Sequence, residues 1–305
     1  MLDVFLNVIM PIFLVAVIAA AFQRWRKISA GPLSQVTLYV LVPALIFTSL
    51  VQQDIAASAS VRIVGATLLT SALILVIGVS VSKILRHDRA MRGAFMLSTG
   101  FPNAGNMALP VLLLAFGDEG LAVGVIIFVT LAIMGQSLGV FIAATSQMNW
   151  MESLKQIFRL PAIYAIAAAL LVRVLDIELP LIAFQPIKLL SQAAIPMMLV
   201  VLGFQLAGEF RLEKVFSLAA ALMMRLLISV PLAYVATLLF GLDALVQSVV
   251  IIVFAMPVAV FTIILSTEFK TNPKFVTNAV VTSTLASTLT LTLVIPLVES
   301  LVMVE

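Results

Sequence analysis

The run Phe101-Pro102-Asn103-Ala104-Gly105-Asn106-Met107-Ala108-Leu109-Pro110 decides the fold of this chain. Its flanks are apolar enough to form a helix, but the run itself holds two prolines, a glycine and two asparagines. Each proline removes a backbone N–H and clashes with the preceding turn, and glycine weakens a helix further. In a bilayer, a broken helix is tolerated only where it is buried in protein or lines a wet cavity. We therefore expect an interrupted membrane helix over 93–116.

The composition predicts an integral membrane protein with little mass outside the bilayer. The 305 residues are 63% hydrophobic and 10% charged, with a mean hydropathy of +1.24, whereas soluble domains are about 25% charged. There is no cysteine, which excludes disulfides and thiolate chemistry. The lone histidine, His87, lies in a basic loop, and we expect it to be solvated there.

Ten segments are long and apolar enough, or nearly so, to span a bilayer, which takes about 20 residues. They are 4–22, 33–51, 61–82, 93–116, 121–144, 161–175, 187–207, 215–240, 244–267 and 276–303. If they alternate in direction, 13 of the 17 Lys and Arg residues fall on one side of the membrane. The positive-inside rule makes that side cytoplasmic and puts both termini outside. Short loops and a compact chain favour a bacterial inner (plasma) membrane.

The chain divides into two halves of five segments each. We expect a first repeat over 1–144, a linker over 145–160 and a second repeat over 161–305, so that 1–305 would form a single transmembrane unit. The linker pattern predicts a short amphipathic helix on the inner surface. Because five is odd, the second half must run opposite to the first.

Interruptions recur at a near-constant offset in the two halves. The pairs are Pro11 with Pro161 at 150 residues, Pro43 with Pro196 at 153, and Gly105 with Pro257 at 152. Two interrupted segments at matching places indicate an inverted repeat with a binding site near the bilayer midplane. The alternative is a simple proline kink in which the asparagines make packing contacts.

The run Asn103–Pro110 resembles the Asn-x-Gly-Asn-(Met/Leu)-(Gly/Ala)-Leu-Pro signature of the auxin efflux carrier family. Members of that family include plant auxin exporters and bacterial permeases for malate, malonate and similar anions. The runs Val42–Phe47 and Met256–Ala259 also match, and the resemblance covers the whole chain in length, helix count and motif order.

The resemblance implies an all-α polytopic membrane protein whose fold is shared with sodium/bile-acid symporters and sodium/proton antiporters. Ten transmembrane helices would form two inverted five-helix repeats, with helices 4 and 9 broken and crossing at the membrane centre. Helices 1, 2, 6 and 7 would form a scaffold, and the others a transport domain that moves against it by alternating access.

Such a crossing predicts a site for an organic anion. The N-terminal ends of two half-helices carry unpaired N–H groups and about half a positive charge each, so they bind anions without a basic side chain. Asparagine amides can donate to a carboxylate. The candidate substrate-binding residues are Asn103, Gly105, Asn106, Gln136, Arg225 and Thr262, with Pro110 and Pro257 as crossover prolines.

Two of these candidates have other readings. Arg225 lies eleven residues past Lys214, or about 16 Å deeper along a helix. It could meet the substrate carboxylate, act as an internal counter-charge, or snorkel to the inner surface. Gln136 lies mid-segment, where a contact between helices is the alternative.

The sequence places no Asp or Glu in the core of any segment. Proton- and sodium-coupled transporters usually need a buried carboxylate. Plant auxin exporters carry one in their third helix, whereas 61–82 here offers only Arg62, Ser71, Ser80 and Ser82. We therefore expect uniport, with sodium or proton coupling through carbonyls and hydroxyls as the alternative.

The expected function is that of a secondary transporter, a permease or efflux carrier, for a small organic anion. A membrane sensor that uses the same cavity without transport is the alternative. An enzyme would need a carboxylate dyad, a Ser-His pair or a metal cluster, and we find none in the sequence. We expect no cofactor, no metal and no nucleic-acid partner, while the oligomeric state stays open, with a homodimer among the alternatives.

Overall fold

The structure is a computed structural model that describes residues 2–53, 56–144, 161–207 and 213–302. Within these ranges the secondary structure is helical, and no strand forms beyond one isolated bridge. The predicted all-helical class is therefore confirmed. The surface helix predicted for the linker 145–160 lies outside the described residues.

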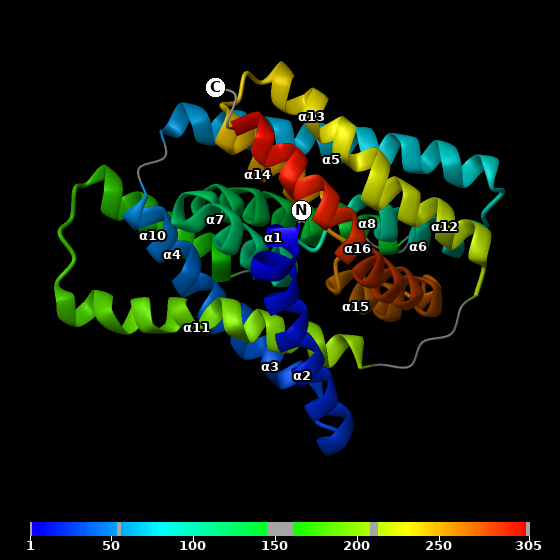
Figure 1. Cartoon of the computed structure of the whole chain (residues 1–305), viewed down its shortest axis with the longest axis horizontal. Helices are drawn as coiled ribbons and strands as arrows, with labels where there is room; N and C mark the ends of the chain where they lie inside the picture. Colours follow the sequence, from blue (N-terminus) through cyan, green and yellow to red (C-terminus); the bar gives the residue numbers. More distant parts are fainter. Residues whose placement is uncertain (1, 54–55, 145–160, 208–212, 303–305) are drawn as a thin grey trace.

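Figure 1 shows the described helices, several of which are joined end to end by π-helical turns, labelled η. In chain order they are α1 (Leu2–Val4), η1 (Phe5–Ile9), α2 (Met10–Arg26), α3 (Ala30–Val36), η2 (Thr37–Leu41), α4 (Val42–Gln52), α5 (Ala57–Ile84), α6 (Arg89–Gly100), η3 (Ala104–Ala108), α7 (Leu109–Met134), η4 (Gly135–Gly139), α8 (Val140–Ala144), α10 (Pro161–Val174), α11 (Leu181–Leu206), α12 (Val215–Met223), η5 (Met224–Ile228), α13 (Ser229–Leu239), α14 (Ala244–Ala255), α15 (Phe261–Glu268) and α16 (Pro273–Val302).

Seven helical runs in the described ranges are long and apolar enough to cross a membrane. The sequence predicts ten segments, and the difference has three physical causes. Predicted segments 4 and 9 break into short helices, α10 has only 14 residues, and the second part of segment 4 joins segment 5 in the run Ala104–Ala144. That run turns sharply at Gly117, whose φ of 62° is left-handed and suits glycine. The count of ten spans stays a prediction.

Proline explains most of the π-helical turns. The turns η1, η2, η3 and η5 each end two or three residues before a proline, namely Pro11, Pro43, Pro110 and Pro231. A proline ring clashes with the carbonyl four residues earlier, and a wider turn relieves that clash. These prolines therefore loosen the helices without ending them.

The helices pack in two groups. One group is linked by the contacts of α11 with α2 and α4 and of α4 with α10, and the other by contacts that connect α5, α6, α7, α13, α14 and α16. Figure 1 shows α11 along α2 and α4 at one edge, with α5, α12 and α13 at the opposite edge. The contact of α11 with α2 is close, since a Cβ on Gly203 would lie 2.2 Å from the Ala16 carbonyl oxygen.

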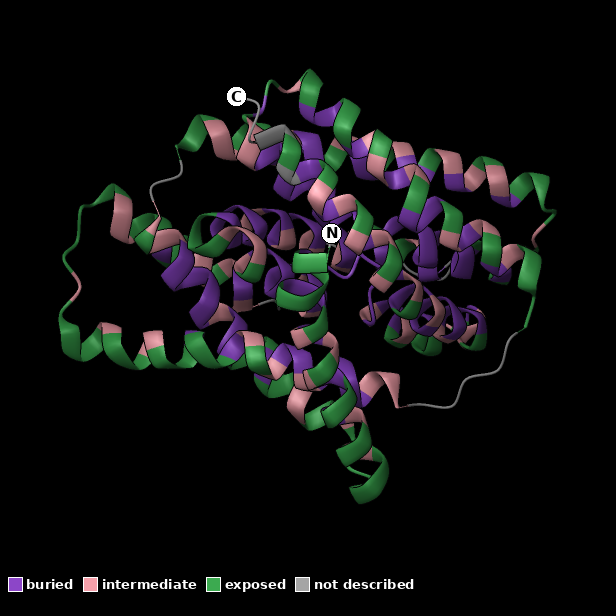
Figure 2. Cartoon of the chain, viewed as in Figure 1, coloured by how far each residue is buried: buried purple, intermediate pink, exposed green. Residues whose placement is uncertain are grey.

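Burial is concentrated between these edges. Figure 2 shows buried residues at the centre of the molecule, where α7 and α14 lie, and exposed residues along the first part of α11. Every residue from Val246 to Ala255 in α14 is buried. Such an all-round apolar helix lies inside the protein rather than against lipid or water.

The expectation of a solvated His87 is wrong. The ring is partly buried between α5 and α12, where Nδ1 lies 3.1 Å from Ser82 Oγ and Nε2 lies 2.9 Å from Ser217 Oγ. The histidine therefore links two helices that are far apart in the sequence.

Candidate functional site

Two broken helices meet at the centre of the fold. One break separates α6 from η3 and α7, and the other separates α14 from α15. The two breaks pair as a minimal antiparallel bridge between Pro102 and Val258. Asn103 N donates to Pro257 O at 2.8 Å, and Ala259 N donates to Phe101 O at 2.9 Å. Backbone groups freed by one break are thus satisfied by the other.

The half-helices that enter the two breaks are closely matched. Both α6 and α14 have 12 residues. Asp88 caps the start of α6 by accepting from Met91 N at 2.8 Å, and Asp243 caps α14 by accepting from Val246 N at 3.0 Å. Starts, ends and caps of the two half-helices are all offset by 155 residues.

This offset bears on the two prolines that the sequence predicts at the crossing, Pro110 and Pro257. At an offset of 155, the partner of Pro257 is Pro102; Pro102 lies in the bridge and Pro257 comes directly before Val258, the other bridge residue. Pro110 is instead the second residue of α7, after the π-helical turn. Because η3 and α7 are continuous, Pro110 lies inside a helical run, and the π-helical turn before it relieves the clash of its ring. Pro257 lies at the crossing as predicted.

A cavity of about 200 Å³ adjoins the crossing. Its polar lining comes from Ser34, Thr37, Asn103, Asn106, Gln136 and Gln205. Its apolar wall includes Leu38, Val42, Phe128, Leu131, Met198, Val201, Phe261 and Ile264. Among the described residues, no charged side chain lines it.

Two helix starts face this cavity. The lining includes Asn103 to Asn106 at the start of η3 and Ala259 to Phe261 at the start of α15. Neither helix has a side-chain cap, because the cap residues Asn103 and Val260 accept no hydrogen bond there. The start of a helix carries the positive end of its dipole. Three N–H groups at these starts already donate to carbonyls of the breaks, namely Ala104 N to Pro102 O, Thr262 N to Ala259 O and Ile263 N to Val260 O. The cavity therefore has a positive electrostatic character without a cationic side chain.

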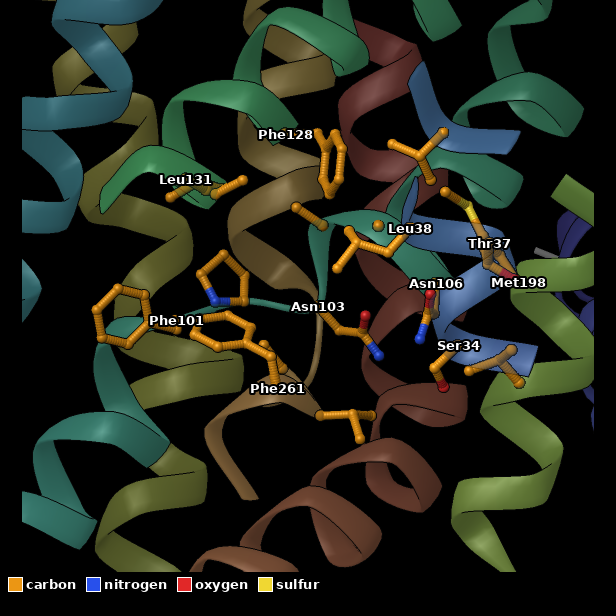
Figure 3. A pocket seen from close by; sticks show the side chains of 18 of the residues that line it. Ser34, Thr37, Leu38, Phe101, Asn103, Asn106, Phe128, Leu131, Met198 and Phe261 are labelled. Atoms are coloured by element: carbon orange, nitrogen blue, oxygen red, sulfur yellow. The ribbon is translucent and has the colours of Figure 1, made fainter. Parts of the chain in front are cut away.

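Of the predicted substrate-binding residues, four line the cavity together, namely Asn103, Gly105, Asn106 and Gln136. Figure 3 shows the side chains of Asn103, Asn106 and Ser34 in the same part of the cavity. Asn103 is 4% exposed, and among the described residues its Nδ2 has no hydrogen-bond partner. Asn106 Nδ2 lies 3.5 Å from Gln205 Oε1. An amide donor without a partner is thus available beside the helix start.

Gly105 packs against the cavity wall. A Cβ at this position would lie 3.0 Å from Phe128 Cε2, which is tighter than an ordinary contact. The glycine lets the helix start approach the ring closely. Thr262 does not line the cavity; it is fully buried, and its Oγ1 donates to Ala259 O at 2.6 Å.

Arg225 also lies outside the cavity lining. It is fully buried on η5, where Nη1 donates to Thr99 O at 2.9 Å and Nη2 donates to Phe254 O at 2.6 Å. Both carbonyls belong to the last turn of a broken half-helix, α6 or α14. Of the roles that the sequence left open, this position favours the internal counter-charge.

Sequence reasoning missed three polar residues of the lining, Ser34, Thr37 and Gln205. Ser34 and Thr37 lie on α3 and η2, and Gln205 lies on α11. All three are near the ends of apolar segments, where polar residues are common and carry little signal. The signal that could have found these three residues is a polar side chain close to a basic loop, in a helix that contacts a broken helix.

The geometry defines a class of protein: a polytopic membrane protein with a cavity at the place where two broken helices meet. In the described residues no group of His, Cys, Asp and Glu could hold a metal ion. Comparison with known proteins agrees with this class, since residues 4–295 match the family described as "Membrane transport protein". The chain therefore belongs to this auxin efflux carrier-like family of membrane transport proteins, and the resemblance found in the sequence is confirmed.

Two archaeal relatives are similar over most of the chain. An uncharacterized transporter of Methanocaldococcus jannaschii is 21% identical over 91% of this chain and 92% of its own length. An uncharacterized transporter of Methanothermobacter thermautotrophicus is 24% identical over 84% of each chain. The family and both relatives are transporters rather than enzymes.

Proposed function

We propose that this protein is a secondary transporter that carries a small organic anion by alternating access, with its site at the crossing. One observation carries the proposal: two uncapped helix starts and the unpartnered amide of Asn103 meet at a cavity whose described lining has no charged side chain. Half-helices that end at a cavity in the membrane are the typical binding site of secondary transporters.

The sign of the substrate follows from the helix ends. Each helix start contributes about half a positive charge. The Asn103 amide nitrogen adds a donor, and no carboxylate is close enough in the described lining to favour a cation. An anion is stabilised there, and a cation is repelled.

The wall of the cavity supports an organic rather than an inorganic anion. Its volume of about 200 Å³ suits a small molecule. Aromatic and aliphatic side chains such as Phe128, Leu131 and Phe261 form most of the surface opposite the polar groups. Apolar walls with a few placed polar groups are typical of small-molecule sites. A small anion with a carboxylate and an apolar body would match both the polar groups and the apolar wall of the cavity.

The buried polar groups favour uniport. Among the described residues, the buried polar and charged side chains include no Asp or Glu. A proton relay or a sodium site usually requires such a carboxylate. Sodium or proton coupling through hydroxyls and carbonyls is the second candidate, and a non-transporting sensor is the third.

The matched half-helices α6 and α14, offset by 155 residues, support the inverted repeat of 1–144 and 161–305 joined by the linker 145–160. We infer ten spans, with α2, α4, α10 and α11 as the scaffold and the other packing group as the transport domain. Ser34 and Gln205 lie near the basic loops, which supports a cavity on the cytoplasmic side. This orientation has both termini outside, in a bacterial inner membrane, and allows a homodimer.

The test is charge movement on proteoliposomes that contain the purified protein. A panel of organic anions is applied with and without a sodium or pH gradient. Wild type is compared with the double variant Asn103→Ala plus Asn106→Ala, and with Asn7→Ala as a control, because Asn7 is exposed on η1 away from the cavity. We expect a current for some anions that the double variant loses and the control keeps.

The same experiment separates the alternatives. A current that requires the sodium or proton gradient would replace uniport by symport and leave the site in place. If charge movement and labelled uptake are both absent from folded wild type across the panel, the transport proposal is wrong and the sensor is favoured.

A further inference from the structure

We propose that Arg225 is the positioning residue of the crossing: one guanidinium ties the ends of α6 and α14 together and thereby fixes the two helix starts that face the cavity. The inference rests on the proposed function only in the claim that the cavity binds a transported anion. The tie itself is a property of the fold and is measured without a substrate.

The contacts are specific to the two breaks. Nη1 of Arg225 binds the Thr99 carbonyl, one residue before the end of α6, and Nη2 binds the Phe254 carbonyl, one residue before the end of α14. The planar fork of an arginine presents two donors in a fixed geometry, so it can hold two acceptors at a set separation. Thr99 and Phe254 are 126 and 29 residues away in the chain. No local turn could bring the three together.

A second group on the same helix reinforces the contact. Ser229 Oγ lies 2.6 Å from the Phe254 carbonyl oxygen and 2.5 Å from the Arg225 carbonyl oxygen. The guanidinium also lies 5.9 Å from the centre of the Phe254 ring. Among the described residues, Nε has no hydrogen-bond partner. The two terminal nitrogens of the guanidinium therefore link the helix ends, and Nε takes no part in the link.

Charge balance explains why this position requires a cation. The C-terminal end of each half-helix carries about half a negative charge, so the two ends together match one guanidinium. Without it, two negative ends and their free carbonyls would face each other in a buried, apolar place. The N-terminal ends at the cavity have no such partner in the described lining. Arg225 thus cancels the negative side of the crossing and leaves the positive side for the substrate.

The consequence for transport is geometric. After Thr99 and after Phe254, the polypeptide continues for a few residues into the bridge of Pro102 with Val258 and then into the start of η3 or α15. Holding the two ends fixes the bridge, and the bridge fixes the spacing of the two helix starts. Arg225 does not line the cavity and acts through these segments.

The experiment is hydrogen–deuterium exchange on the full-length protein in detergent or nanodiscs, comparing wild type with Arg225→Gln. The matched control is Arg62→Gln, since Arg62 Nη1 also donates to a backbone carbonyl, that of Gly241, but does so on an exposed loop. We expect Arg225→Gln to speed exchange about tenfold or more in peptides from both breaks, 101–108 and 257–263, because a hydrogen bond to a charged group contributes at least that factor. Arg62→Gln should leave both unchanged.

Two milder variants keep the test decisive if Arg225→Gln does not fold. Arg225→Lys keeps the charge and loses the fork, so exchange should rise at both breaks by less than in Arg225→Gln. Ser229→Ala removes one donor from Phe254 O, so exchange should rise at 257–263 and stay unchanged at 101–108. Unchanged exchange at either break in both Arg225 variants, or a rise spread evenly over all helices, would overturn the proposal.

Uptake of radiolabelled benzoate into proteoliposomes links the tie to transport. If wild type transports benzoate, Arg225→Gln should raise the half-saturating concentration about tenfold or more, and Arg225→Lys should restore part of the loss. Equal uptake kinetics in wild type and Arg225→Gln would overturn the positioning role. If wild type takes up no anion, the proposed function fails, while the exchange pattern still decides whether Arg225 ties the breaks.

Discussion

The two breaks are entered by closely matched half-helices and have very different side chains. Each follows a half-helix of 12 residues capped by an aspartate. The first break continues into Asn103, Gly105 and Asn106, whereas the second continues through the apolar run Met256–Val260. Polar partners for the second break come from other helices, as when Val258 N donates to Ser283 Oγ at 3.0 Å.

This difference assigns the two breaks separate tasks. Both supply a helix start to the cavity, so both contribute to the charge of the site. Only the first supplies amide side chains that can recognise a particular group. We infer that anion selectivity follows from the pair of breaks, and that discrimination between anions follows from the first break and the wall around it.

The largest expected effect comes from a charge placed at the first break. Asn103→Asp keeps the size of the side chain and replaces a buried donor by a buried anion, next to the place where the substrate anion would lie. Like charges in a low-dielectric site repel strongly. We expect anion uptake into proteoliposomes to fall by about a hundredfold or more.

The matched control is Val260→Ala, because Val260 holds the cap position of α15 that Asn103 holds for η3. It removes apolar contact from the wall but no polar group and no charge, so uptake should fall by about tenfold, the lower end of what a group of this size contributes in an apolar pocket. Equal loss in the two variants would show that the breaks do not differ in recognition.

A smaller effect is expected at Gly105. In Gly105→Ala the new Cβ would lie 3.0 Å from Phe128 Cε2, so the ring must shift into the cavity or the helix start must move. Overpacking of this kind typically costs about 1–3 kcal/mol. Uptake of bulky anions should fall about tenfold and that of small anions should fall less, when both are measured in competition. Adding Phe128→Leu should restore the bulky anions, and failure of that rescue would contradict a steric cause.

The sequence was informative about the first break because the signal there is local. Two prolines, a glycine and two asparagines within ten residues cannot continue a membrane helix, and the structure breaks within that run. The pairing of the two breaks was less accessible. The run 101–110 holds two prolines, and only the structure shows that Pro102, rather than Pro110, lies opposite the second break. The sequence offset of 152 therefore differs from the 155 of the matched half-helices.

Contacts between distant helices explain what the sequence could not provide. Arg225 was an isolated charge in an apolar segment until Thr99 and Phe254 were seen beside it. Gln205 was one polar residue at the end of a helix until Asn106 was seen at 3.5 Å. Such partners depend on the packing of α11, η3 and η5, and no residue pattern along one helix contains that information.

We expect the second break, Met256–Val260, to depend on Ser283 of α16 more than on its own side chains. Ser283→Ala leaves the buried Val258 N–H without its acceptor, at a cost of about 1–3 kcal/mol. We expect the midpoint of thermal unfolding in detergent to fall by several degrees, with a modest loss of uptake. Ser300→Ala, which removes an exposed hydroxyl bonded to Leu297 O, should not change it. No difference between the two serines would mean that Val258 N–H finds another acceptor.

The smallest expected effect concerns the N-terminal ends of the half-helices α6 and α14. His87 lies just before α6, whereas α14, which begins at Ala244 after its cap Asp243, has no histidine nearby because the chain has only one. Burial lowers the pKa of His87 from its usual 6.5; Lys214 and Arg92 lower it further, and Asp88 opposes them. Because the folded pKa lies below the unfolded one, the unfolded state takes up the proton first on acidification. Stability is therefore full above about pH 6.5 and falls as the pH drops below that value. The midpoint of unfolding should decline more between pH 7.5 and 5.5 in wild type than in His87→Gln, and equal declines would exclude His87 as the source.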